Sequence, residues 1–136
     1  MNSSSSTRSR AAWAVIGLLL AIETLLLAWV LVVTILATVA SDGAVAQNVS
    51  LVIVAAASLA WIAITLVGAI RSRSSWARGS TLTIHVLLFA AGTGCLQLLI
   101  GPWWFGFALV ALALLGFVAA VLARPEERAS AEAGAE

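Results

Sequence analysis

The sequence has few charged residues and lacks the residue patterns that usually mark catalytic sites. Asp, Glu, Lys and Arg make up 10% of the 136 residues, whereas soluble globular domains contain about 25%. The chain has no Gly-rich phosphate loop, no Cys-x-x-Cys and no Cys/His cluster with metal-ligand spacing. Its only cysteine, Cys95, cannot form an internal disulfide. We therefore expect no enzyme activity, no metal and no cofactor, and the net charge of +1 gives no reason to expect nucleic-acid binding.

Apolar residues dominate the composition of the chain. They make up 62% of the chain, and the mean hydropathy is +1.11. A membrane span needs about 20 apolar residues, so the charge-free stretch 79–123 is too long for one crossing, and Gly101-Pro102 divides it in two. The pattern predicts an all-α polytopic membrane protein, a bundle of four transmembrane helices in contact with the lipid bilayer. We place these helices at about 12–38, 47–70, 81–100 and 103–123.

The arginines predict the orientation of the chain. In a four-span arrangement all seven fall on one side of the membrane, at positions 8, 10, 71, 73, 78, 124 and 128, whereas the other side carries only Asp42. Positive charge marks the cytoplasmic side. We therefore expect a protein of a bacterial plasma (inner) membrane with both termini in the cytoplasm, disordered tails at 1–10 and 125–136, and the transmembrane domain at 11–124. The first span is too long for a signal-peptide core and is expected to remain uncleaved.

The polar segment between the second and third spans contains Arg71, Arg73 and Arg78. Its simplest role is to determine topology. The alternative is attraction to anionic lipid headgroups, worth about 1 kcal/mol for each arginine near the surface.

Glu23 is the only formally charged residue inside a long apolar segment. A charged side chain at the centre of a bilayer costs about 2.5–3.5 kcal/mol, so such a residue usually faces a helix interior, a partner or a water-filled cavity. Counting along the helices places Ser58 and Thr93 at about the same depth. We expect Glu23, Ser58 and Thr93 to form an intramembrane polar site. A carboxyl group without water favours its neutral form, which can donate one hydrogen bond.

Four other polar residues lie within the predicted spans, namely Thr34, Thr65, His85 and Gln97. Thr34 shares a helix stripe with Glu23, so these side chains form either a polar path or ordinary hydrogen bonds between packed helices. Counted from about residue 81, His85 is about 10 Å shallower than Glu23, which argues against direct pairing. His85 either relays protons to Glu23 or bonds locally to a carbonyl or threonine near the interface. Gln97 lies on a different face of the helix from His85.

Three short segments stand out, 76–79 before the third span, 101–106 at the start of the fourth and 122–125 at its end, together with Glu23 in the first span. In these features the chain resembles a group of small, uncharacterised integral membrane proteins of actinobacteria with four transmembrane helices. The likeness covers most of residues 11–125 and implies the same four-span fold without implying an activity. A weaker architectural likeness, four short helices with a glutamate in the first, is to small multidrug-resistance transporters.

Two functions fit these features. The first is an accessory or scaffold subunit that acts through helix–helix interaction with a membrane-protein partner or with a second copy of itself. The alternative is a proton-coupled transporter or channel for small molecules that uses Glu23.

Overall fold

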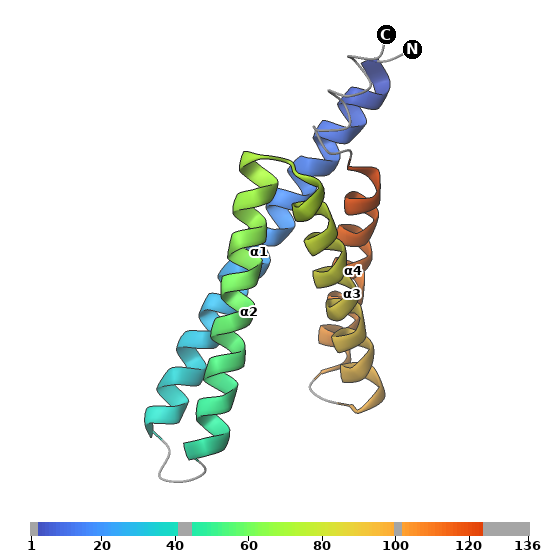
Figure 1. Cartoon of the computed structure of the whole chain (residues 1–136). Helices are drawn as coiled ribbons and strands as arrows, with labels where there is room; N and C mark the ends of the chain where they lie inside the picture. Colours follow the sequence, from blue (N-terminus) through green and yellow to red (C-terminus); the bar gives the residue numbers. More distant parts are fainter. Residues whose placement is uncertain (1–2, 41–44, 100–101, 124–136) are drawn as a thin grey trace.

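The structure is a computed structural model that describes residues 3–40, 45–99 and 102–123. This part of the chain folds into four α-helices (Figure 1), which are α1 (Ser3–Ala40), α2 (Val45–Arg71), α3 (Ser75–Gln97) and α4 (Trp103–Leu122). All four are long and apolar enough to cross a membrane. The predicted all-α fold with four long apolar helices is therefore confirmed for the described residues.

The observed helix ends lie within three residues of the predicted ones except at the starts of α1 and α3. Helix α1 begins at Ser3 and so includes a stretch that we expected to be a disordered tail. Helix α3 begins at Ser75, earlier than predicted, because the Ser74 side chain accepts a hydrogen bond from the backbone N–H of Ala77 at 3.3 Å. A serine in this position satisfies one of the free N–H groups at the start of a helix. The predicted loop around Asp42, the Gly101 break and the tail 125–136 lie outside the described residues.

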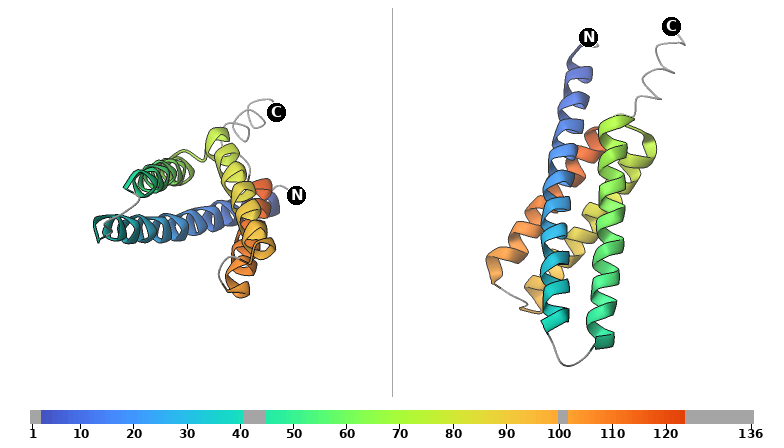
Figure 2. Two further views of the ribbon diagram at one scale, coloured as in Figure 1. Left: turned by 90° about the horizontal axis from the view of Figure 1, so that it is seen from below. Right: turned by 90° about the vertical axis from the view of Figure 1, so that its left-hand side faces the viewer.

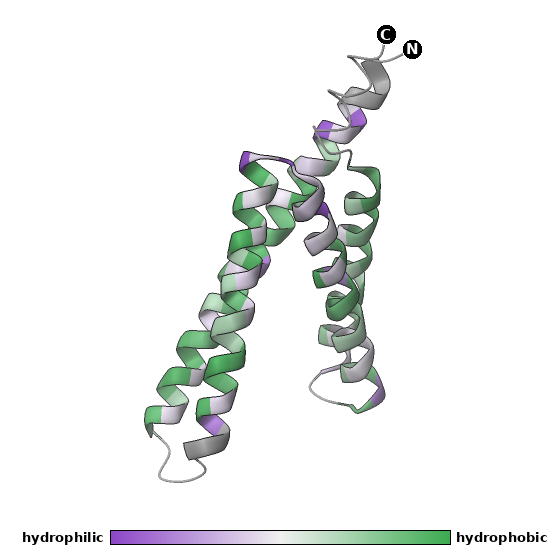
Figure 3. Ribbon diagram, in the orientation of Figure 1, coloured by the Kyte–Doolittle hydropathy of each residue, from purple (hydrophilic) through white to green (hydrophobic). Residues whose placement is uncertain are grey.

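The helices form two antiparallel hairpins, α1–α2 and α3–α4, that together have the shape of an inverted V (Figure 1, Figure 2). The hairpins meet where α2 ends, α3 begins and α4 ends, and they diverge towards the opposite end. Helix α1 extends beyond this joined end. Hydrophobic residues make up most of the length of both hairpins (Figure 3).

The buried core lies at the joined end of the hairpins. Large side chains of α1 pack there against alanines of the other three helices, and alanines allow helix backbones to approach closely. The core consists of Ala12, Trp13, Ile16, Leu20, Ala69, Ala77, Ile84, Ala119, Ala120 and Ala123. The two hairpins are therefore packed together at one end, and at the other end they do not cover each other.

A chain of hydrogen bonds connects α2 to α3 near this core. The indole N–H of Trp61 donates to Ser80 Oγ at 2.8 Å, and Ser80 Oγ lies 2.7 Å from Thr65 Oγ1. Thr65 uses its own hydroxyl proton to donate to the Trp61 carbonyl at 2.9 Å, so Ser80 must be the donor in the Ser80–Thr65 bond. Trp61, Ser80 and Thr65 therefore each donate one hydrogen bond and each accept one.

Candidate functional site

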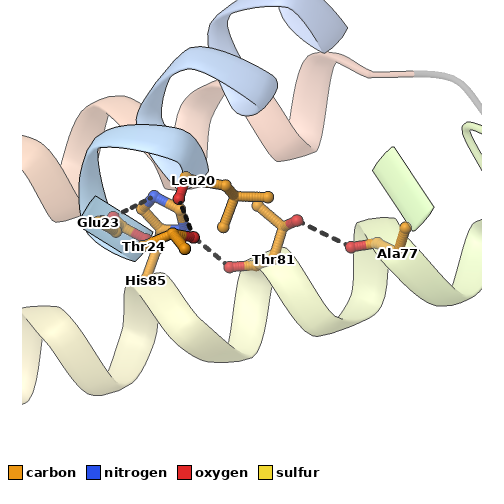
Figure 4. Close-up of polar contacts among 6 residues, drawn as sticks. All are labelled: Leu20, Glu23, Thr24, Ala77, Thr81 and His85. Atoms are coloured by element: carbon orange, nitrogen blue, oxygen red, sulfur yellow. Dashed lines mark hydrogen bonds and ion pairs between the residues drawn. The ribbon is translucent and has the colours of Figure 1, made fainter. Parts of the chain in front are cut away.

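Glu23 lies on α1 one turn beyond Leu20 of the core at the joined end (the vertex of the V), and its side chain faces His85 of the other hairpin (Figure 4). Its side chain is only 7% exposed. The nearest charged or titratable partner is His85 of α3, whose Nε2 is 3.3 Å from Glu23 Oε1 (Figure 4). The direct Glu23–His85 pairing that depth counting argued against is therefore present.

The reason for this difference is the early start of α3. With the helix beginning at Ser75, His85 lies ten residues inside it, about 15 Å along the axis. Glu23 lies about 17 Å beyond Ala12, where α1 enters the core. The two residues therefore reach the same level of the bundle.

The surroundings of His85 determine which ring nitrogen carries hydrogen. The imidazole is fully buried, and its Nδ1 is 2.8 Å from the backbone carbonyl oxygen of Thr81, one turn earlier on α3. A carbonyl oxygen can only accept a hydrogen bond, so Nδ1 must be protonated. Nε2 is then the nitrogen that faces Glu23, either as a lone pair or as an N–H group.

Three buried atoms of the pair make no hydrogen bond to any described residue. They are Glu23 Oε1, Glu23 Oε2 and His85 Nε2. Two arrangements make the Glu23–His85 contact attractive, a neutral acid donating to Nε2 or an imidazolium donating to a carboxylate. Each arrangement has one proton between Oε1 and Nε2. Without that proton, a negative oxygen would face a nitrogen lone pair in a buried site.

Helix α4 closes the other side of the imidazole. Gly116 is buried, and a Cβ atom built on it would overlap His85 Nε2. The missing side chain therefore makes the space that the ring occupies. The sequence contains a signal for this close approach, because Gly116 and Ala120 are small residues four positions apart on α4.

The expected site of Glu23, Ser58 and Thr93 does not form as predicted. The Glu23 carboxyl group forms no hydrogen bond with the hydroxyl group of Ser58 or of Thr93. The Thr93 hydroxyl instead donates to the Phe89 carbonyl of its own helix at 2.8 Å, and Ser58 is half-buried on α2. Because Thr93 lies more than two turns beyond His85 on α3, it is too far along the helix to share the level of Glu23.

The remaining predicted polar residues play separate roles. Thr34 donates to the Val30 carbonyl within α1 at 2.8 Å, and Thr65 belongs to the α2–α3 junction. Gln97 is exposed at the last position of α3. No hydrogen bond in the described part of the chain connects Thr34 or Thr65 to the carboxyl group of Glu23. Of the predicted secondary positions, only His85 joins Glu23.

The three arginines around the α2–α3 connection differ in their surroundings. Arg78 donates from Nε to the Ala120 carbonyl at 2.8 Å and from Nη2 to the Val121 carbonyl at 3.3 Å. These carbonyls lie in the last turn of α4, where a cation stabilises the free acceptors and the negative end of the helix dipole. Arg71 is exposed and Arg73 is half-buried. Arg78 therefore has a packing role that the sequence analysis did not identify.

The pair does not extend into a metal centre in the described ranges, which hold no group of three or more His, Cys, Asp or Glu residues. Comparison with known proteins found no matching family model, no matching curated protein and no matching solved structure. The function is therefore inferred from the residues of the chain itself.

Proposed function

We propose that the protein is a multi-pass protein of a bacterial plasma membrane and acts there as an accessory or scaffold subunit. Support for the membrane location comes from four helices of sufficient length and apolarity. Support for cytoplasmic termini comes from the described arginines, which lie near the start of α1, at the end of α2, in the following turn and near the start of α3, and so fall on one side of a four-span arrangement. Cysteine labelling from one side of the membrane tests this orientation, with Ser72→Cys expected to be cytoplasmic and Gly43→Cys external in a Cys95→Ala background. Equal labelling of both positions from one side would contradict it.

The observation that carries the scaffold role is the shape of the molecule. The hairpins pack together at one end only, and almost none of the apolar part of α2 is buried. Away from the joined end, large apolar side chains remain exposed on both hairpins, among them Trp29 (69%), Leu36 (63%) and Phe107 (57%). Association of membrane helices depends on van der Waals packing, and these long uncovered faces provide area for it.

Crosslinking within the native membrane tests the scaffold role. A photoreactive amino acid at Trp29 or Phe107 is expected to give one reproducible product of defined mass with a membrane partner or a second copy. The same group at Leu20, which is fully buried, is the matched control and is expected to react only within the chain. The scaffold role is refuted if the exposed positions yield only the uncrosslinked monomer.

One observation favours a second function, that of a proton-coupled carrier. A buried acid paired with a histidine inside a membrane span is the kind of arrangement that proton relays use. This function predicts that proteoliposomes containing the protein dissipate a pH gradient and that Glu23→Gln abolishes the flux. Absence of flux through the parent protein, or unchanged flux through the variant, would exclude it.

A further inference from the structure

The three unpartnered atoms at the vertex require a physical explanation. A buried polar atom without a hydrogen bond is costly, and while the helices remain packed around the pair neither lipid nor bulk water supplies the missing partner. Glu23 Oε1 and His85 Nε2 face each other from different hairpins, so their missing hydrogen bond weakens the contact between the hairpins. Whatever satisfies these two atoms therefore also affects how the hairpins are held together.

We propose that Glu23 and His85 bind a single proton between Oε1 and Nε2 and that this proton fastens α1 to the α3–α4 hairpin. The backbone supports the arrangement, because the Thr81 carbonyl keeps hydrogen on Nδ1 and turns Nε2 towards the acid. Gly116 supports it from the other side, since the ring occupies the space where a side chain would be. The role is independent of any partner or transported molecule.

The geometry favours a proton over a larger ligand. His85 Nε2 lies so close to Gly116 that not even a methyl group fits beside it. One carboxylate and one imidazole provide fewer side-chain ligands than the three or four of typical protein metal sites. A proton needs no additional space and satisfies both facing atoms at once.

Apart from the contact between Glu23 and His85 themselves, no charged side chain in the described part of the chain is hydrogen-bonded to Glu23 or to His85 Nε2. In the described part of the chain, Glu23 is the only acidic residue and His85 the only histidine, and α4 has no charged residue. Arg78 of α3 is bonded to the last carbonyls of α4. The remaining described arginines are Arg8 and Arg10 near the start of α1, Arg71 at the end of α2, and Arg73 in the following turn. No second side chain is therefore in place to neutralise the Glu23 carboxylate once its proton leaves.

Loss of the proton has a mechanical consequence. The carboxylate then faces the Nε2 lone pair across 3.3 Å with no other hydrogen bond, and separation of α1 from α3 lets water reach both atoms. The apolar core that includes Trp13 and Ala119 keeps the hairpins joined at its level and acts as the hinge. Rising pH is therefore expected to widen the V at its open end.

Distance measurement on the purified chain in lipid nanodiscs tests this latch. Spin labels at Leu36→Cys on α1 and Phe107→Cys on α4, in a Cys95→Ala background, report the separation of the hairpins at exposed positions. We expect the distance to lengthen from acid to alkaline pH in the parent. Glu23→Gln is expected to stay at the short distance at every pH, because the amide cannot ionise and its NH₂ group still donates to Nε2. Thr34→Val, a polar change on the same helix outside the pair, is expected to follow the parent.

Two results would overturn the latch. One is a parent distance that stays constant over the pH range, and the other is a Glu23→Gln distance that changes as the parent's does. If Glu23→Gln does not fold, infrared titration of the parent provides the second measurement. It is expected to show ionisation of the pair at the pH at which the distance changes, and ionisation without a distance change contradicts the proposal.

Discussion

At the scale of single residues, Glu23 and His85 each depend on the other, because removing either one leaves a buried polar group without its facing partner. Replacing His85 with leucine leaves a buried carboxyl group without its facing partner, and such a loss costs about 1–3 kcal/mol. Replacing both residues with apolar ones of similar size removes the unpaired group as well. We therefore expect His85→Leu to lower the thermal midpoint of unfolding in detergent and Glu23→Met/His85→Leu to restore most of it. Additive losses in this double-mutant cycle would show that the two side chains do not interact.

The fit between Gly116 and the imidazole gives a second prediction at this scale. The methyl group of Gly116→Ala would overlap His85 Nε2, and forcing an extra carbon into a packed site typically costs about 1–3 kcal/mol. Gly94→Ala is the matched control, because a Cβ at Gly94 meets nothing within 4 Å and alanine favours a helix. Thermal unfolding in the same detergent compares the two variants, and an equal effect of both would contradict the packing described for Gly116.

At the scale of helices, Arg78 connects the start of α3 to the end of α4. Arg78→Met removes both hydrogen bonds to the α4 carbonyls but keeps the apolar stem of the side chain. We expect faster hydrogen exchange in the last turn of α4, because its free end loses a cap. Arg71→Met, at an exposed position, is the control and is expected to leave exchange in α4 unchanged. Equal protection of α4 in both variants would refute the capping role.

The start of α3 shows how far the sequence could predict the site. Long apolar runs and the Gly101-Pro102 break were sufficient to predict four helices, because the length and hydropathy of a segment can be read from that segment alone. The Ser74 cap is also a local signal, but we placed the start of the helix near Thr81, and the estimated depth of His85 shifted accordingly. The pairing of Glu23 with His85 depends in addition on how the hairpins tilt against each other and on the space at Gly116, and neither property is contained in any one helix.

At the scale of the whole molecule, the vertex of the V combines the core and the polar pair in one region. Trp13, Ile16 and Leu20 pack at the joined end, and Glu23 follows on the next turn of α1. Changes at the pair are therefore expected to alter the angle between hairpins without separating them, because the core remains intact. A partner that binds the uncovered faces would favour one angle and so change the affinity of the pair for its proton, since linkage between two binding events is reciprocal.

The most direct test of the central claim is the protonation of His85. It is the only histidine in the chain, so nitrogen NMR of histidine-labelled protein, prepared without a histidine tag, reports this ring alone. In bilayers we predict hydrogen on Nδ1 at acid and alkaline pH and a Nε2 signal that changes once as the shared proton leaves, with that change absent in Glu23→Gln. A ring protonated on Nε2 and bare on Nδ1, or a Nε2 titration that is the same in Glu23→Gln, would contradict a single proton held between Glu23 and His85.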